Sequence, residues 1–332
     1  MTLKGHTKPI SALDFTTPYG QLISASFDQS LKVWDLVSGD EIQELIGHKG
    51  MVKCLQVEDQ TCITAGIDGQ IRIWDLSIDP DDFNHSNQRE SNQDDGDDPD
   101  VEKLTSPCVR KLEGHTQPIT ALYFDHTCLV TGSTDKTIRQ WDLETGQNLL
   151  TMDILWAMQH YHPPSTTSSK LKQPKIVYED DAENDFVGGI QFWGYALASG
   201  SADGCVRMWD MRTGQAHRTL VGHTGPIRCL QFDEMHLISG SVDKTIKVWD
   251  LRTGTISDTI KYFDSITSLQ FDSRKIISTS GTNHINVYNR TTLEHSKIDE
   301  GNGHLDVVER LRYLDRYLIS GGKDGLCKVW SI

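Results

Sequence analysis

An aromatic residue recurs at a fixed place in seven similar segments of the chain, and this repetition constrains the fold more than any other feature. Six tryptophans each follow an aspartate by six positions, and a tyrosine fills the one gap in the series. The positions are Trp34, Trp74, Trp141, Trp209, Trp249 and Trp330, with Tyr288 in the gap. Such self-similarity at a fixed period marks a repeat architecture, and the seven repeats leave little of the chain outside themselves.

Within each repeat the pattern is that of short strands. Residues 227–232, 237–241 and 246–249 are rich in β-forming residues and are separated by turn residues. A weaker fourth segment, such as residues 216–220, precedes each Gly-His pair. Four antiparallel strands in a unit of about 40 residues are typical of a propeller blade. The sequence therefore predicts an all-β fold, with residues 1–332 forming a single seven-bladed propeller.

The two ends of the chain predict how this ring closes. The last repeat ends at Trp330-Ser331-Ile332 and lacks an outer strand. Residues 2–4 lie directly before the first Gly-His pair, where an outer strand belongs. We expect the N-terminus to supply the fourth strand of the last blade, because closure removes the exposed sheet edges that invite aggregation.

A set of polar residues recurs with the tryptophans. The histidine and the turn aspartate are 20 residues apart in four repeats and 22 apart in the first, and a hydroxyl residue stands four positions before the aspartate. On these repeats the whole chain resembles the WD40 family. In that family the aspartate orients the histidine, the histidine bonds the hydroxyl, and the hydroxyl meets the indole N–H. The positions implied are His6, Ser24, Asp28 and Trp34; His48, Thr64, Asp68 and Trp74; His115, Thr131, Asp135 and Trp141; Ser199, Asp203 and Trp209; His223, Ser239, Asp243 and Trp249; and His304, Ser320, Asp324 and Trp330.

The resemblance to the WD40 family implies that this polar network has a structural role and not a catalytic one. A buried polar chain specifies one geometry when every member is satisfied. A catalytic Asp-His-Ser triad would be a single constellation, and five copies around a ring argue against it. The fourth repeat has Glu183 where a histidine is expected, and the sixth keeps only Ser278 of the set. We expect these two blades to rely on packing alone and to be the weakest part of the ring.

Composition narrows the function further. The net charge is −15, of which residues 79–100 carry −8, so the rest of the chain carries only −7 and shows no basic footprint for nucleic acid. No apolar run reaches the 18 residues of a membrane span. The seven cysteines include no Cys-x-x-Cys pair and are typical of core residues in a reducing compartment. Neither a metal cluster nor a phosphate-binding loop is apparent, so we predict a non-enzyme without cofactors.

Two insertions interrupt the repeats. The first, at about residues 77–105, is acidic and nearly free of aromatics, which is the signature of disorder. It belongs to the face opposite the Gly-His loops and is either a solvated loop or an acidic docking site. The second, at residues 153–184, replaces the Gly-His loop that enters blade four. Its apolar start, residues 154–158, packs either onto its own domain or onto a partner.

In WD40 proteins, partners commonly contact two rings of side chains on the Gly-His face. One ring is the second residue of each first strand, and the other is the residue before the turn aspartate. The second ring is unusually apolar here, and exposed apolar residues rimmed by polar ones mark a protein-binding surface. The predicted protein-binding residues are Phe27, Lys53, Ile67, Thr120, Thr134, Arg228, Val242, Glu309 and Lys323. A phosphodegron receptor needs several arginines, and these positions offer only Arg228, which disfavours that class.

At finer detail the chain resembles the fungal mitochondrial-division adaptors. The features that carry this resemblance are residues 137–143, the long insertion after blade three, residues 196–200 and 249–255, and the degenerate sixth blade ending at residues 287–290. In that family a C-terminal propeller binds a dynamin-related GTPase. Other regions, which we do not find in this sequence, bind an outer-membrane anchor and dimerise.

The resemblance implies the GTPase-recruiting module of a longer adaptor. We expect the chain itself to be monomeric and cytoplasmic, peripheral on the mitochondrial outer membrane in the full-length protein. We predict no nucleic acid as a partner and no direct insertion into the membrane. The alternatives are a general cytoplasmic WD40 scaffold and the substrate receptor of a ubiquitin ligase.

Overall fold

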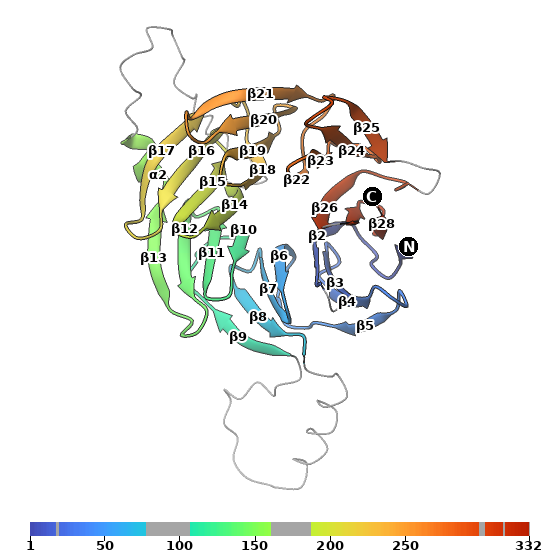
Figure 1. Ribbon diagram of the computed structural model, residues 1–332. Helices are drawn as coiled ribbons and strands as arrows, with labels where there is room; N and C mark the ends of the chain where they lie inside the picture. Colours follow the sequence, from blue (N-terminus) through green and yellow to red (C-terminus); the bar gives the residue numbers. More distant parts are fainter. Residues whose placement is uncertain (18–19, 78–106, 161–186, 299–302, 315, 332) are drawn as a thin grey trace, which may run out of the picture.

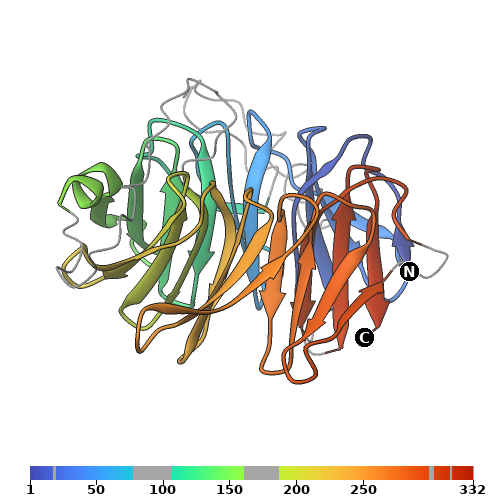
Figure 2. The ribbon, with the colours of Figure 1, turned by 90° about the horizontal axis from the view of Figure 1, so that it is seen from above.

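The protein is a ring of seven four-stranded antiparallel sheets, in a computed structural model that describes residues 1–17, 20–77, 107–160, 187–298, 303–314 and 316–331 (Figure 1). The predicted all-β, seven-bladed WD40 propeller is confirmed. In each sheet, or blade, the first strand lies nearest the axis and the last lies at the circumference. Seen from the side, the strands run between two faces (Figure 2).

The first strands line the axis. They are β2 (Ile10–Phe15), β6 (Val52–Glu58), β10 (Ile119–Phe124), β14 (Val187–Trp193), β18 (Ile227–Phe232), β22 (Ser268–Phe271) and β26 (Val308–Leu314). The second strands form the buried middle of each blade. They are β3 (Gln21–Ser26), β7 (Thr61–Gly66), β11 (Cys128–Ser133), β15 (Ala196–Ser201), β19 (His236–Ser241), β23 (Lys275–Thr279) and β27 (Tyr317–Gly322).

The third strands carry the repeated tryptophans. They are β4 (Leu31–Asp35), β8 (Ile71–Asp75), β12 (Thr137–Asp142), β16 (Cys205–Asp210), β20 (Thr245–Asp250), β24 (Ile285–Asn289) and β28 (Cys327–Ser331). The outer strands are more exposed. They are β5 (Glu41–Glu44), β9 (Cys108–Leu112), β13 (Asn148–Asp153), β17 (Gln215–Val221), β21 (Thr255–Lys261), β25 (His295–Ile298) and β1 (Thr2–Leu3).

The N-terminal strand closes the ring, as predicted. β1 pairs antiparallel with β28, with Thr2 opposite Lys328 and Leu3 opposite Cys327. The Met1 amino group donates to the carbonyl oxygen of Val329 at 3.0 Å, and both chain ends lie at this blade (Figure 1). Leu3 is buried among side chains of the first and seventh blades. Blade seven therefore consists of β26, β27, β28 and β1.

Aromatic side chains on the third strands join neighbouring blades. Trp74 of blade two packs in one apolar cluster with Ile23 and Val33 of blade one. The same arrangement, an aromatic residue against the second strand of the preceding blade, recurs at every junction. The pairs are Trp34 with Ile319, Trp141 with Ile63, Trp209 with Val130, Trp249 with Ala198, Tyr288 with Ile238 and Trp330 with Ile277. The repeated aromatic position thus forms the core between blades, where large buried rings contribute most.

Side chains from the first strands also link one blade to the next around the axis. In blade two, the Gln56 carboxamide accepts from the backbone N–H of Phe124 and donates to its carbonyl oxygen, both at 2.9 Å. Gln191, Gln231 and Gln270 each accept a backbone N–H from the following blade in the same way. These links satisfy backbone groups that face the channel along the axis and would otherwise lack a partner.

The second insertion begins with a short helix, α2 (Ile154–Gln159), at the outer edge of the ring (Figure 2). The Asp153 carboxylate accepts the backbone N–H of Trp156 at 3.1 Å and so caps the helix. Ile154 and Ala157 are buried in the core between blades three and four. The apolar start of the insertion therefore packs onto its own propeller. Residues 161–184 of this insertion, and the acidic insertion from residue 78 to 105, lie outside the described residues.

Candidate functional site: the Gly-His face

The Gly-His face is the face formed by the loops that enter each first strand and by the turns between second and third strands. Five blades build it on the same hydrogen-bonded chain. In blade five, the Trp249 indole donates to the Ser239 hydroxyl oxygen at 2.8 Å, and Ser239 lies 2.8 Å from Nε2 of His223. Nδ1 of His223 lies 2.8 Å from the Asp243 carboxylate. With the indole donating to it, the hydroxyl donates to Nε2, and the Nδ1–H donates to the carboxylate.

The other four chains have closely similar geometry. The contacts between histidine and carboxylate, between histidine and hydroxyl, and between indole and hydroxyl measure between 2.7 and 3.1 Å. The residues are His6, Ser24, Asp28 and Trp34; His48, Thr64, Asp68 and Trp74; His115, Thr131, Asp135 and Trp141; and His304, Ser320, Asp324 and Trp330. Each aspartate lies in the turn between the second and third strands and bonds the histidine in the loop that enters the first strand. The chains therefore fix the shape of the Gly-His face.

Burial sets the protonation of these groups. It lowers the pKa of His6 and His304 below the ordinary histidine value despite the neighbouring carboxylates, which favours neutral rings. Burial alone would raise the pKa of Asp135 and Asp243. Hydrogen bonds from the paired histidine and from a turn threonine instead hold the pKa of both carboxyls well below its usual range. A neutral histidine beside an ionised aspartate is the state that the hydrogen-bond pattern requires.

Blade four replaces the histidine by an arginine, so the expectation that it relies on packing alone is wrong. Arg207, on β16, is buried and places Nη2 at 2.5 Å from the Asp203 carboxylate. Its Nη1 donates to the Ser201 hydroxyl at 2.6 Å. Trp209 still donates to Ser199 at 2.9 Å. Glu183, which the repeat spacing sets at the histidine position, lies outside the described residues.

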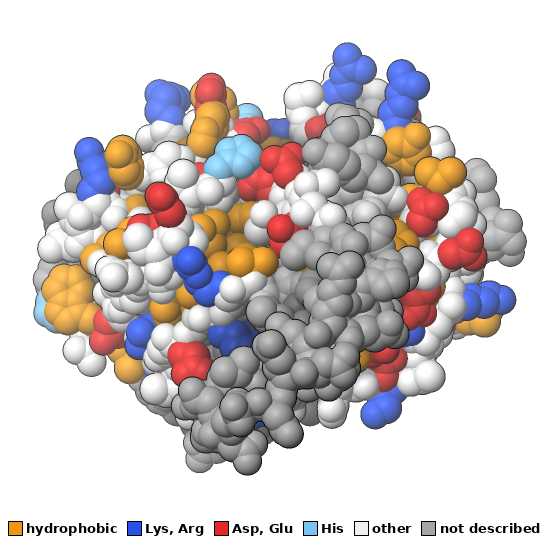
Figure 3. All heavy atoms as spheres, turned by 90° about the horizontal axis from the view of Figure 1, so that it is seen from below, with side chains coloured by type: hydrophobic (Ala, Val, Ile, Leu, Met, Phe, Trp, Pro, Cys, Tyr) orange, Lys and Arg blue, Asp and Glu red, His pale blue; other side chains and the backbone are white. Residues whose placement is uncertain are grey.

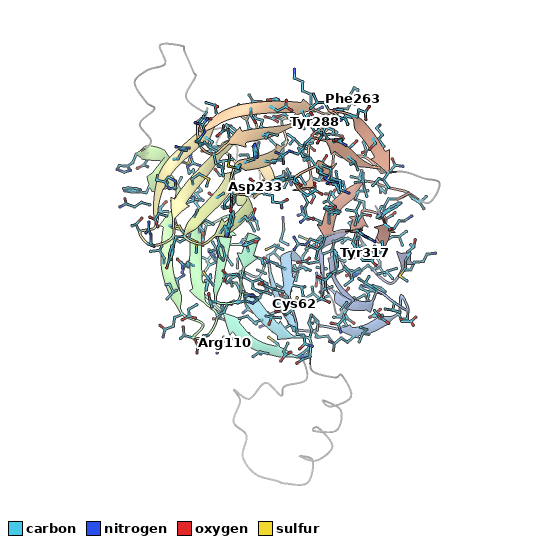
Figure 4. All side chains as sticks on the ribbon, viewed as in Figure 1. Cys62, Arg110, Asp233, Phe263, Tyr288 and Tyr317 are labelled. Carbon is cyan, nitrogen blue, oxygen red and sulfur yellow. The ribbon has the colours of Figure 1, made fainter. Side chains whose placement is uncertain are left out.

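Blade six keeps one link of the polar chain, so the expectation of packing alone is wrong here too. The Ser278 hydroxyl donates to the Tyr262 hydroxyl at 3.1 Å, with Tyr262 at the histidine position. Tyr288 lies at the tryptophan position and is oriented differently, because its hydroxyl donates to Asp258 on β21 at 3.3 Å. Figure 4 shows Tyr288 within this blade. The sixth blade therefore has a shorter polar network than its neighbours.

β-Bulges lie beside the first of the two predicted rings, which consists of the second residue of each first strand. The pairing of first and second strands shifts register next to the second residue of the first strand in blades one to five and seven. Such a residue is left out of the ladder and its side chain is re-aimed. The residues concerned are Ser11, Lys53, Thr120, Arg228 and Glu309, and the equivalent position of blade four is Gly188, which has no side chain.

The predicted protein-binding residues differ in how much of their surface is exposed. Arg228 and Lys323 are exposed, and Phe27 and Ile67 expose 45% and 43% of their surface. The remaining positions other than Thr120 are half-buried. They are Lys53, Thr134, Val242 and Glu309. Phe27, Ile67, Arg228 and Lys323 therefore offer the most contact area among the predicted residues.

Thr120 does not belong to this surface. Its hydroxyl donates to the carbonyl oxygen of Val187 in the next blade at 2.6 Å, and only 8% of the residue is exposed. Ser11 makes the equivalent bond to Val52 at 2.7 Å. A bulged hydroxyl residue at this position thus joins two blades, and we remove Thr120 from the candidate binding residues.

Two exposed apolar residues on this face were missed by the sequence reasoning. Phe263 and Leu305 expose 98% and 87% of their surface and directly follow the histidine position in blades six and seven. Figure 4 labels Phe263. Four other blades have threonine or lysine there, at Thr7, Lys49, Thr116 and Thr224. The replacement of polar by apolar residues at one repeat position was a signal that could have found them. Together with Phe27 and Ile67, they place exposed apolar side chains on four consecutive blades.

The sequence reasoning also missed Arg310, which adds an arginine at the axis of the ring. It is the third residue of β26 and lines a cavity of about 190 Å³ at the Gly-His end of the central channel, together with Lys53 and Arg228. The prediction that the face offers one arginine was therefore too low. The first-strand position of Arg310 belongs to neither predicted ring, which is why it was overlooked.

Within the described residues, charged side chains are mixed and possible metal ligands are dispersed. Acidic and basic side chains are interspersed over the described part of the side seen in Figure 3. Among the residues that the structure describes, no three His, Cys, Asp or Glu side chains are grouped to hold a metal ion. The described helix is too short to cross a membrane.

Comparison with known proteins agrees with this geometry. The model of the WD domain, G-beta repeat, matches residues 1–35, 39–75, 106–142, 181–210, 214–250 and 299–331. The chain belongs to the WD40 family. The matched ranges omit residues 251–298, which contain the sixth blade with its shortened polar network. The repeat that departs furthest in sequence is thus still a four-stranded blade in the structure.

Curated relatives place the chain more narrowly. It is 47% identical to Mitochondrial division protein 1 of Mycosarcoma maydis and 50% identical to that of Malassezia globosa, in both cases over 100% of this WD40 chain. It is 41% identical to Mitochondrial division protein 1 of Aspergillus clavatus over 99% of the chain. The matches cover 50%, 52% and 52% of these relatives, so the chain spans about half of their length.

Proposed function

We propose that this chain is a non-catalytic adaptor propeller that acts in mitochondrial division by recruiting a dynamin-related GTPase through its Gly-His face. The observation that carries the proposal is the run of exposed apolar residues on four consecutive blades beside an exposed arginine. Aromatic and arginine residues of this kind dominate the energetics of protein interfaces. The relatives named Mitochondrial division protein 1, similar over the whole chain, supply the process.

The scaffold suits such a role. Aromatic residues pack at every junction between blades, and glutamine side chains join four pairs of neighbouring blades at the axis, so the face is presented rigidly. A preformed surface loses little conformational entropy on binding. We propose that the protein is cytoplasmic and reaches the mitochondrial outer membrane through an anchor protein. That contact would belong to the half of the relatives that this chain does not span. A modest affinity suffices, because a polymeric GTPase and clustered adaptors gain by avidity.

The proposal is tested by titrating the chain into a purified fungal dynamin-related GTPase in a calorimeter. Phe27→Ala and Arg228→Ala should each weaken binding by about 1–3 kcal/mol, as for interface hot spots. Both side chains are exposed, so neither change should alter the melting temperature. Tyr195→Ala is the matched control, because Tyr195 is an aromatic residue exposed on the opposite face.

Two further variants separate the alternatives. Replacing aspartates 94, 95, 97 and 98 by asparagine tests the acidic insertion and should change only the salt dependence of binding. Trp156→Ala tests docking through α2. If the acidic variant abolishes binding while Phe27→Ala and Arg228→Ala bind normally, the faces have been assigned the wrong way round. Absence of GTPase binding by the unaltered chain would favour a general scaffold or a ubiquitin-ligase receptor.

A further inference from the structure

The mouth of the central channel on the Gly-His face carries three cationic side chains. Lys53, Arg228 and Arg310 line its cavity of about 190 Å³, and none of the other described residues that line it is acidic. The cavity opens toward the Gly-His face, because its lining comes from the first residues of the inner strands. A positive, partly enclosed cavity concentrates anions, since low-dielectric walls strengthen electrostatic attraction.

Arg310 is fixed across this mouth by backbone groups from both sides. Its Nε donates to the carbonyl oxygen of Ser11 at 2.7 Å, and its Nη1 donates to that of Thr267 at 3.3 Å. The equivalent residue of the other six blades is small, which leaves room for the guanidinium. Those residues are Ala12, Cys54, Ala121, Gly189, Cys229 and Ser268. The two carbonyls use two of the five N–H donors of an arginine.

No carboxylate neutralises the two arginines within the described part of the chain, where Arg228 and Arg310 form no ion pair. The nearest candidate by sequence, Glu309, pairs with Lys323 at 3.3 Å. Burial raises the pKa of the nearby Cys229 thiol to about 12, and the charges of Arg310 and Arg228 act in the opposite direction. The mouth is therefore a preformed cationic site.

We propose that the channel mouth binds one oxyanion, a carboxylate or phosphate group carried by a protein partner, with Arg228 and Arg310 as its cationic ligands. Planar guanidinium groups match the oxygen geometry of both anions. The bound group would sit at the centre of the face that carries Phe27 and Ile67. It would fix the orientation of a partner that those apolar residues hold. The site deepens the proposed adaptor function and rests on it only for the identity of the partner.

The site is tested without any partner, by nuclear magnetic resonance of the whole chain titrated with sodium phosphate and, separately, sodium acetate. Sodium chloride keeps the ionic strength constant. We expect saturable shifts at Ser11, Thr267 and Arg310 with at least one of the two anions. Arg228→Met and Arg310→Met should each weaken that binding about tenfold, the loss of one charge-assisted hydrogen bond. Arg252→Met removes an exposed arginine of the opposite face and should behave as the unaltered chain.

The outcomes of these titrations identify the anionic group that binds, and they separate the anion site from the proposed GTPase recruitment. Saturation by acetate assigns a carboxylate, and saturation by phosphate alone assigns a phosphorylated partner. Shifts that fail to saturate, or that persist unchanged in both Arg228→Met and Arg310→Met, would overturn the site. Arg310→Lys retains the charge and guards against loss of the fold, and Arg228→Met is decisive if Arg310→Met does not fold. Saturable phosphate or acetate binding without any GTPase binding would leave the site standing and refute the proposed function.

Discussion

Arg312 of the seventh blade lies with its Nε 2.7 Å from Oδ1 of Asp14 in the first blade. Asp14 is buried, and it also accepts the backbone N–H groups of Phe15 and Val57, each at 2.9 Å. In the first strands of blades two, four, five and six, glutamine stands where Asp14 and Arg312 stand here, and blade three has Tyr123. The junction that closes the ring thus uses an ion pair in the place of neutral carboxamide links.

Because the closing junction uses an ion pair, we expect the loss of either Asp14 or Arg312 to destabilise it. Burial raises the pKa of Asp14, and the positive charge of Arg312 opposes that shift. Arg312→Ala should destabilise the fold by about 1–3 kcal/mol, less than the 3–5 kcal/mol of a fully buried pair because a third of the Arg312 side chain is exposed. Chemical denaturation at pH 7 measures the change.

The matched variant is Asp14→Gln with Arg312→Gln, which places at both positions the glutamine of blades two, four, five and six. We expect it to be more stable than Arg312→Ala, because no buried carboxylate is left without a counter-charge. Equal stability of the two variants would mean that the ion pair does not hold the junction.

The repeat pattern predicted the regular part of this structure and missed the exceptions. Trp249, Ser239, His223 and Asp243 recur at fixed spacing. The blade number and the closure by β1 could be predicted from the repeats, and the polar chain from the resemblance to the WD40 family. Arg207 could not, because a basic residue two places before the aromatic position is common to most repeats and only spatial proximity shows that this one reaches an aspartate. Arg207 pairs with Asp203 in its own blade through a contact that the other repeats do not share, so no periodic signal reveals it.

The binding face shows the same division. The ring positions of Phe27 and Arg228 follow from the repeat, whereas the burial of Thr120 follows from the carbonyl of the next blade. The position of Arg310 across the channel depends on carbonyls of blades one and six. Contacts between blades, which join residues far apart in the sequence, account for what sequence reasoning could not supply.

Arg207 makes blade four dependent on one side chain. The Arg207 and Asp203 side chains are 2% and 3% exposed. Burial would raise the pKa of Asp203, but its hydrogen bond with Arg207 lowers it overall. Arg207→Ala should therefore cost about 3–5 kcal/mol, the range for removing one partner of a buried pair. The free energy of unfolding in urea measures this loss.

The control is the double variant Arg207→Ala with Asp203→Ala. It should be less destabilised than Arg207→Ala alone, because it leaves no unpaired buried charge. A double variant as unstable as the sum of the two single ones would show that Arg207 stabilises the blade by packing and not through Asp203.

The N-terminal strand offers a third test. Leu3 is buried and packs with Cys327 and Ile319, although β1 has only two paired residues. Leu3→Ala should cost about 2–4 kcal/mol, as expected for a buried leucine. Deleting residues 1–4 should lower the melting temperature at least as much as Leu3→Ala does, because the deletion also exposes the edge of β28. A melting temperature unchanged by both alterations would contradict closure by this strand.

The buried histidines predict a dependence of stability on pH. The pKa of His6 and His304 is lower in the folded protein than in the unfolded chain, so the unfolded chain binds protons first as the pH falls. Stability should therefore decrease as the pH drops through about 6.5, the ordinary histidine pKa. His304→Gln keeps a donor and an acceptor without a titrating ring. Urea denaturation between pH 7.5 and 5.5 should show a shallower slope for this variant, and an identical slope would exclude His304 as a source.

The last prediction concerns how far the binding surface extends around the ring. Phe263 and Leu305 are almost fully exposed, so Phe263→Ala and Leu305→Ala should leave the melting temperature unchanged. If the partner covers blades six and seven as well as one and two, each variant should weaken GTPase binding by about 1–3 kcal/mol, as Phe27→Ala should. Exposed apolar residues gain the most from burial in an interface, because they lose unfavourable contact with water.

Comparison with Phe27→Ala makes the result specific. Weakening by Phe27→Ala alone would confine the partner to blades one and two. Weakening by Phe263→Ala and Leu305→Ala alone would move it to blades six and seven, away from Ile67. Only losses in all three variants agree with one partner that spans the four consecutive blades. Such a footprint would bring the partner past the channel mouth, where Arg310 lies between Ser11 and Thr267.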